Sequence, residues 1–193
     1  MAVIISRRSS YCPTFATAPP DLDNLLERAV SKHMFGTKMR SFIRLPVEWV
    51  DAVVAQQFAI AQQILRFGLV PIVEPEVDIH SPRKIEVEDQ LRVTLRKELD
   101  QLKEDQAVIL KLTLPETDDF YRELVEHRRV IRVLALSGGY SRAEANARLA
   151  RNPGIVASFS RALTEGLTVT QDDREFDAVL DETIGTIAEA SRT

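Results

Sequence analysis

A single lysine, Lys111, interrupts an apolar run at residues 107–114, which reads AVILKLTL. The run has the length and composition of a buried strand, and successive side chains of a strand point to opposite faces. Lys111 therefore shares one face with Ile109 and Thr113, and the valine and leucines of the run take the other. Burying an ammonium group is costly, so the position of this lysine requires a chemical explanation.

Two further apolar runs carry charges at alternate positions. Lys38 and Arg40 share one face of FGTKMRSFI, and Glu74 and Glu76 share one face of LVPIVEPE. If these faces meet that of Lys111, the interior holds three cations and two carboxylates. Desolvation costs on the order of several kcal/mol per ion, so a fold that keeps these ions is expected to use them. The alternatives are a structural ion cluster, or lysines that reach out to water.

These residue types are suited to covalent catalysis on a carbonyl compound. Burial and neighbouring cations both favour the neutral amine of a lysine. A neutral Lys111 amine can attack a carbonyl carbon to give a carbinolamine and then an iminium, the Schiff-base route. Glu74 and Glu76 would transfer the protons that dehydration requires and provide a counter-charge for the iminium. Lys111 is therefore predicted to be a nucleophile.

Two later runs end in residues that are suited to phosphate. Ser137, Gly138 and Gly139 end one run directly before a helical segment, where backbone N–H groups can face an anion. Ser158 and Arg161 follow the next run, and an arginine makes forked contacts with phosphate oxygens. For the Ser-Gly-Gly segment alone, a plain turn is the alternative. Together with the arginine, it favours a phosphate site.

The elements that must position these residues alternate along the chain. Strands are predicted at residues 35–43, 69–76, 107–114, 130–137 and 154–160, and helices at residues 21–33, 46–67, 84–103, 118–128, 141–151, 162–166 and 172–191. Right-handed crossovers turn this alternation into a parallel sheet with helices outside.

Two architectures fit this pattern, an open doubly wound sheet and part of a (β/α)8 barrel. In both, the chemistry occurs at the carboxyl ends of the strands, where the charged residues lie. Neither a P-loop nor a G-x-G-x-x-G motif follows any strand, so the nucleotide-binding form of the open sheet lacks its usual signature.

Composition excludes several classes of protein. The 193 residues are 45% hydrophobic, enough for one domain with a sizeable core. The net charge is −4 and the cations are interspersed with acids, so no nucleic-acid partner is predicted. Cys12 is the only cysteine, which favours a cytoplasmic protein. No apolar run approaches the roughly 20 residues of a membrane span. His33, His80 and His127 lie too far apart to suggest a zinc site.

Residues 1–20, MAVIISRRSSYCPTFATAPP, are predicted to form an unstructured leader, and residues 21–193 the folded part. The apolar run of the leader is too short for a signal peptide, and its arginines follow that run instead of preceding it. An organellar transit peptide is the alternative, since the segment contains serine and arginine and no acidic residue.

Five stretches, in this order, resemble the strand ends of the class I fructose-bisphosphate aldolases, in particular the shorter bacterial type. They are FGTKMRS, GLVPIVEPEVDI, VILKLTLP, RVLALSGGYSRAEAN and ASFSRAL. The resemblance runs from about Asp21 to the C-terminus. It implies a (β/α)8 TIM barrel of which this chain has the last five βα units. The first three strands, with a catalytic aspartate and a phosphate-binding lysine, have no counterpart here.

The resemblance also implies an activity. The family consists of lyases of glycolysis and gluconeogenesis that reversibly cleave fructose 1,6-bisphosphate to dihydroxyacetone phosphate and glyceraldehyde 3-phosphate, without a metal or other cofactor. Lys111 would be the Schiff-base lysine, Glu74 the proton acceptor and donor, and Glu76 and Lys38 their positioning partners. Phosphate would be bound by Ser137, Gly138, Ser158 and Arg161 at one end of the substrate and by Arg40 at the other.

Five parallel strands cannot close into a barrel. We therefore expect weak or no activity from the isolated chain, and an active species that is a homo-oligomer. A non-catalytic remnant that serves as an oligomerisation or binding module is the alternative function. A Schiff-base barrel of the deoxyribose-phosphate aldolase or transaldolase type is a third possibility, and the EPE and LSGGYSR stretches argue against it.

Overall fold

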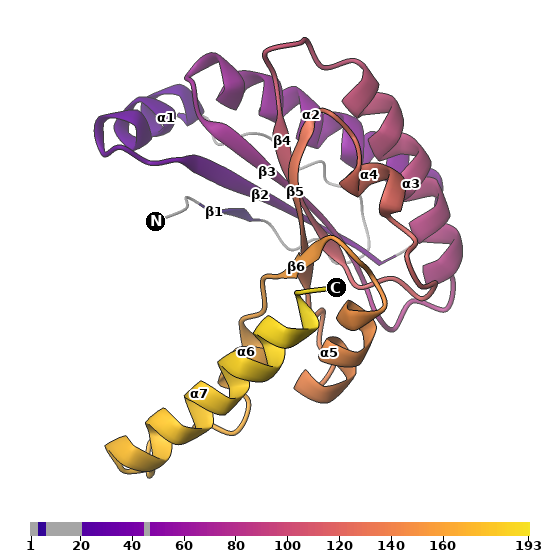
Figure 1. Ribbon diagram of the computed structural model, residues 1–193. Helices are drawn as coiled ribbons and strands as arrows, with labels where there is room; N and C mark the ends of the chain where they lie inside the picture. The colour runs from indigo at the N-terminus through magenta and orange to yellow at the C-terminus, as the bar shows by residue number, and fades with distance from the viewer. Residues whose placement is uncertain (1–3, 7–20, 45–46) are drawn as a thin grey trace.

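The strands of the protein run parallel and neighbour one another in the order of the sequence (Figure 1). The computed structural model describes residues 4–6, 21–44 and 47–193. The strands in this part are β1 (Ile4–Ser6), β2 (Gly36–Ile43), β3 (Val70–Val77), β4 (Val108–Thr113), β5 (Val130–Leu136) and β6 (Ile155–Ala157). All five predicted strands are confirmed, although β6 has only three residues.

The helices occupy the predicted positions between and after the strands. They are α1 (Leu22–Ser31), the 3-10 turn η1 (Val47–Trp49), α2 (Val50–Arg66), α3 (Lys84–Asp100), α4 (Arg122–Val125), α5 (Arg142–Ala150), α6 (Arg161–Thr164) and α7 (Asp173–Ala190). The helix expected at residues 118–128 is a single turn, α4. Pro46, expected to begin a helix, lies outside the described residues. None of the helices described is long and apolar enough to cross a bilayer.

The strand order decides between the two predicted architectures. An open doubly wound sheet reverses its strand order at a switch point. Here the order is β1-β2-β3-β4-β5-β6 without reversal, as in a barrel. Helices α2, α3 and α4 lie along the same side of the sheet (Figure 1). The fold is therefore an α/β fold of the (β/α)8 type, present as a partial barrel.

The first strand was not expected. Ile4–Ser6 pairs in parallel with β2, with Ile4 opposite Lys38 and Ser6 opposite Arg40. The prediction of an unstructured leader is wrong for these three residues, and the rest of the leader lies outside the described part. The reason is physical: the edge of β2 offers backbone N–H and C=O groups, and a short apolar run can satisfy them.

The core lies between the sheet and its helices. The residues of β4 that were predicted to share the face opposite Lys111, namely Val108, Leu110 and Leu112, are almost completely buried, as is Leu114 directly after the strand. They belong to one hydrophobic cluster with leucines of α3. The opposite face of β4 is thereby left to Lys111, as the alternation of side chains predicted.

Candidate active site

A buried carboxylate, Glu74, lies between two lysines. The Lys38 Nζ is 2.6 Å from Oε2 of Glu74, and the Lys111 Nζ is 3.4 Å from Oε1. The Glu74 side chain is 4% exposed, whereas Lys38 and Lys111 are 17% and 15% exposed. Three neighbouring strands, β2, β3 and β4, therefore direct these groups to one point.

A second ion pair lies further along the same strands. Nε and Nη2 of Arg40 are each 2.5 Å from Oε2 of Glu76. The charged faces of β2, β3 and β4 therefore meet, which is the condition under which the five charged side chains share one side of the sheet. They form two groups, however: Lys38 and Lys111 contact Glu74, while the guanidinium of Arg40 is held by Glu76.

A side chain replaces the backbone ladder where β3 and β4 end. Between these strands, Ile72 is paired with Ile109 and Val73 with Leu110. Further along β3, Pro75 has no N–H to donate. Beyond it, the hydroxyl of Thr113 accepts from Val77 N at 2.9 Å and donates to Val77 O at 3.0 Å. Thr113 thereby joins the strand ends that carry Glu76 and Lys111.

The predicted phosphate residues also come together. Gly138 and Gly139 have φ angles of 64° and 121°, a region that favours glycine. A methyl group at Gly138 would lie 2.6 Å from Cγ2 of Ile79, and one at Gly139 would lie 3.9 Å from Nη1 of Arg161. The guanidinium of Arg161 therefore lies against the Ser-Gly-Gly turn.

The two serines of the predicted phosphate site end adjacent strands. Ser137 follows β5 and is buried, whereas Ser158 follows β6 and is partly exposed. The backbone N–H of Ser158 donates to Ala135 O at 2.8 Å, which extends the ladder between β5 and β6 by one residue. Arg161 begins the short helix α6 directly afterwards. Residues 137–139 and 158–161 thus lie together at the carboxyl ends of the adjacent strands β5 and β6.

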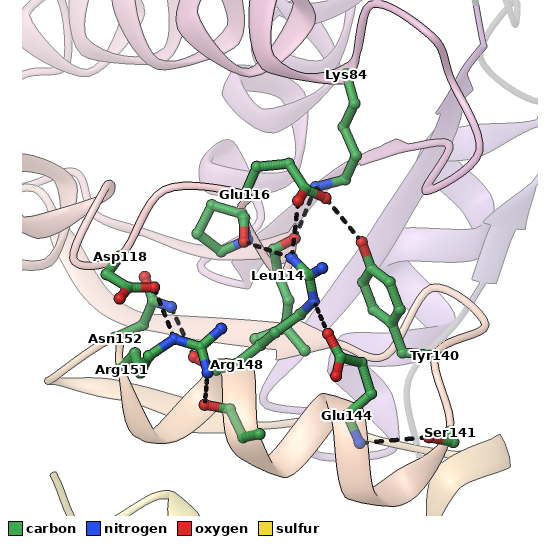
Figure 2. A network of polar contacts seen from close by, with 12 residues as sticks. Lys84, Leu114, Glu116, Asp118, Tyr140, Ser141, Glu144, Arg148, Arg151 and Asn152 are labelled. Atoms are coloured by element: carbon green, nitrogen blue, oxygen red, sulfur yellow. Dashed lines mark hydrogen bonds and ion pairs between the residues drawn. The ribbon is translucent and has the colours of Figure 1, made fainter.

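A polar network that no sequence pattern predicted lies beside these strand ends (Figure 2). Its members include Lys84, Glu88, Glu116, Tyr140 and Arg148. Only the spacing of Lys84 and Glu88, four residues apart on a helix, was a usable signal. The other members come from separate loops and helices, so no local pattern links them.

Possible metal ligands do not gather in the described part of the chain: residues 4–6, 21–44 and 47–193 contain no group of three or more His, Cys, Asp or Glu side chains able to hold an ion. Of the three histidines, His127 contacts a carboxylate, with Nε2 at 3.1 Å from Oδ1 of Asp100.

Fold and site together define a partial (β/α)8 barrel with a lysine–glutamate cluster at the carboxyl ends of its strands. No family model matches the sequence. Curated relatives do match, each named fructose-bisphosphate aldolase class 1. The protein of Synechocystis sp. is 57% identical over 175 residues, that of Porphyromonas gingivalis 51% over 173, and that of Clostridium acetobutylicum 49% over 174. The chain is therefore similar, over most of its own length, to class 1 fructose-bisphosphate aldolases.

The match covers most of this chain but little more than half of each relative. It covers 89–90% of this chain but 58–59% of each relative. The chain thus spans less than two thirds of the length of the curated relatives it matches. The similarity extends over this part of the aldolase chain, and any activity of this chain depends on its own residues.

Proposed function

We propose that this chain provides the Schiff-base half of a fructose 1,6-bisphosphate aldolase. The observation that carries the proposal is the position of Glu74 between Lys38 and Lys111, on a face that the strands direct inward. A lysine that forms an imine needs a proton acceptor within reach, and Glu74 is the group in contact with it.

The chemistry follows from this contact. The Lys111 amine, after its proton passes to Glu74, adds to the C2 ketone of the sugar to give a carbinolamine. Glu74 returns the proton to the hydroxyl, which leaves as water and forms the iminium. The iminium accepts the electron pair of the C3–C4 bond as the C4 hydroxyl passes its proton to the Glu74 carboxylate, so glyceraldehyde 3-phosphate leaves. Protonation of the enamine at C3 and hydrolysis then release dihydroxyacetone phosphate and the free amine.

The phosphate groups of the substrate would be held at two places. Ser137, Gly138, Ser158 and Arg161 would bind one phosphate at the edge formed by β5 and β6, where Arg161 lies against the turn. Arg40 would approach the other. Because Glu76 already engages Nε and Nη2 of Arg40, a second phosphate would have to share or displace this ion pair.

Borohydride trapping tests the proposal directly. Incubation with dihydroxyacetone phosphate and borohydride should give a covalent adduct at Lys111, located by peptide mass spectrometry. The Lys111→Met variant should give none, and its circular dichroism should match that of the parent. A folded, unmodified Lys111 after this treatment would end the catalytic proposal.

The alternative, a non-catalytic module for oligomerisation or binding, is favoured by a different observation. β1 and β6 are the outer strands of the described sheet. The C-terminal segment covers part of the β6 edge, since Ala157 N donates to the Ser191 hydroxyl at 3.2 Å, and the remaining backbone groups of the two outer edges can pair with another chain. For the catalytic proposal, a homo-oligomer in the cytoplasm is the assembly in which these edges are covered. A cleavage assay across size-exclusion fractions separates the two functions, because the module would be oligomeric without turnover.

A further inference from the structure

A buried lysine joins three elements beside the proposed site. Nζ of Lys84, at the start of α3, lies 2.5 Å from Oε1 of Glu88 and 3.1 Å from Oε1 of Glu116. It also donates to the backbone carbonyl of Leu114 at 3.0 Å (Figure 2). Leu114 and Glu116 follow β4, the strand of Lys111. The lysine therefore ties the loop after β4 to the first turn of α3.

The carboxylate of Glu116 extends these contacts to the next loop. The Tyr140 hydroxyl donates to Oε1 of Glu116 at 3.0 Å, and Nη1 of Arg148 lies 3.2 Å from Oε2 (Figure 2). The Glu116 N–H in turn donates to Oε2 of Glu88 at 3.1 Å. One side chain thus receives contacts from α3, from the loop after β5 and from α5.

Arg148 fixes the tyrosine from its other side. Its guanidinium lies 4.3 Å from the centre of the Tyr140 ring, within cation–π range. The same group donates to Pro115 O at 3.2 Å and pairs with Glu144 at 2.7 Å. Tyr140 is therefore held through its ring and its hydroxyl, and both partners belong to one network.

The two loops that this network joins carry the two halves of the proposed site. Tyr140 directly follows the Ser-Gly-Gly turn, and its N–H donates to Ser137 O at 2.9 Å. On the other side, a methyl group at Gly138 would lie 3.5 Å from Cγ2 of Thr113, two residues after Lys111. The separation between the phosphate turn and the lysine depends on how these loops are held together.

We propose that Glu116 and Tyr140 are positioning residues that hold the Ser137–Gly139 turn at a fixed distance from Lys111, so that a bound phosphate places the ketone at the amine. The proposal rests on the aldolase function proposed above. Stability alone does not explain this network, because buried ion pairs are often no more stabilising than apolar side chains of similar size.

The electrostatics agree with this geometry. Partial burial acts to raise the pKa of Glu116, but the hydrogen bond and charge of Lys84, with Tyr140 and Arg148, lower it overall. Burial, followed by the hydrogen bond to Glu116, raises the pKa of Tyr140 well above its usual value. The carboxylate thus stays an acceptor and the hydroxyl a donor at neutral pH.

The test compares Tyr140→Phe and Glu116→Gln with the control Asp118→Asn. Asp118 pairs with Arg151, the residue that follows α5, at 2.8 Å and so joins the same loop to the end of that helix, but its side chain is 59% exposed and lies outside the contacts of Tyr140. Borohydride trapping is measured against the concentration of dihydroxyacetone phosphate, and again with dihydroxyacetone. Hydrogen exchange of residues 137–140 is followed by mass spectrometry.

Both variants should raise the half-saturating concentration of dihydroxyacetone phosphate about tenfold, as loss of one hydrogen bond to a charged group implies, with an unchanged rate at saturation. Trapping with dihydroxyacetone, which has no phosphate, should not change. Exchange at residues 137–140 should accelerate in both variants and not in the control.

The outcomes separate this inference from the function on which it rests. No adduct with the parent protein removes the aldolase proposal, and the positioning role with it. An adduct with equal half-saturating concentrations and equal exchange in all proteins overturns the positioning role alone. If Glu116→Gln does not fold, Tyr140→Phe, which removes only a hydroxyl, decides the question.

Discussion

At the scale of single residues, the site depends on one carboxyl group shared by two lysine side chains. Glu74 contacts Lys38 and Lys111 through different oxygens, so it can stay paired with one lysine while it exchanges a proton with the other. Such a shared position suits a group that must accept a proton and later return it.

Glu74→Gln keeps the size of the side chain and removes its ability to accept a proton. We expect the rate of adduct formation at Lys111 to fall by at least about 100-fold, the usual contribution of a general base. Glu76→Gln is the matched control, since Glu76 pairs with Arg40 and not with the lysine; its effect should be smaller. Equal trapping rates for the parent and Glu74→Gln would remove Glu74 from the mechanism.

A second residue-scale prediction concerns Tyr121, whose hydroxyl is buried without a hydrogen-bond partner among the described residues. Burial raises the pKa of Tyr121 well above its usual value. A tyrosine with a raised folded-state pKa stabilises the protein fully below the unfolded pKa of about 10, and this stability is lost as pH rises above it. The unfolded chain can ionise there and the folded chain cannot.

Tyr121→Phe should therefore cost little or be stabilising at pH 7, because it removes an unpaired polar group. Above a pH of about 10 its advantage over the parent should grow, by up to about 1.4 kcal/mol per pH unit. Urea unfolding of the parent and of Tyr121→Phe, at pH 7 and above a pH of about 10, measures this difference in the free energy of unfolding.

Tyr140→Phe, which loses a hydrogen bond to Glu116, should instead be destabilised at pH 7 by about 1 kcal/mol.

At the scale of elements, the turn after β5 constrains Gly138 in two ways, through its backbone angle and through the space around it. Gly138 needs a positive φ angle and also needs space for the Ile79 side chain, which would lie 2.6 Å from a methyl group there. Gly68, at the end of α2, needs only the angle, because nothing lies within 4 Å of a methyl group at that position. Substitutions at Gly68 and Gly138 therefore distinguish the cost of backbone strain from the added cost of a steric clash.

Gly68→Ala should lower the free energy of unfolding by about 1 kcal/mol, the cost of a left-handed conformation. Gly138→Ala should lower it by about 2–4 kcal/mol, since the contact with Ile79 adds to the strain. Denaturant unfolding of both variants measures the difference. Equal losses would mean that Ile79 moves away freely and does not support the turn.

At the scale of the whole molecule, the described strands form an arc with β1 at one edge and β6 at the other. The C-terminal helix α7 extends away from this arc (Figure 1), and Phe176 and Ile184 on it are partly exposed apolar side chains. Exposed strand edges and apolar side chains both favour association with another chain.

We therefore expect light scattering after size exclusion to give a mass above the 21.8 kDa of one chain. The cleavage activity of the proposed aldolase should follow the oligomer and disappear on dilution to the monomer. A monomer with full activity would show that the arc of strands needs no partner. In that case the open edges would have no bearing on the site.

Much of the fold and part of the site could be predicted because their signals are local. The alternation of side chains placed Lys38, Glu74 and Lys111 each on the charged face of its own strand, and β4 confirms the expected division into a buried and a charged face. Helix α5 begins where expected, with the Ser141 hydroxyl accepting from Glu144 N as its cap.

The sequence by itself determined which residues face inward, because a strand repeats every two residues whatever surrounds it. Only the tertiary structure decided that β1 pairs with β2, that Arg40 is held by Glu76, and that Glu116 joins Tyr140 to Lys84. These contacts connect residues far apart in the chain. Their partners are chosen by how the strands and loops pack in space, which no periodicity in the sequence records.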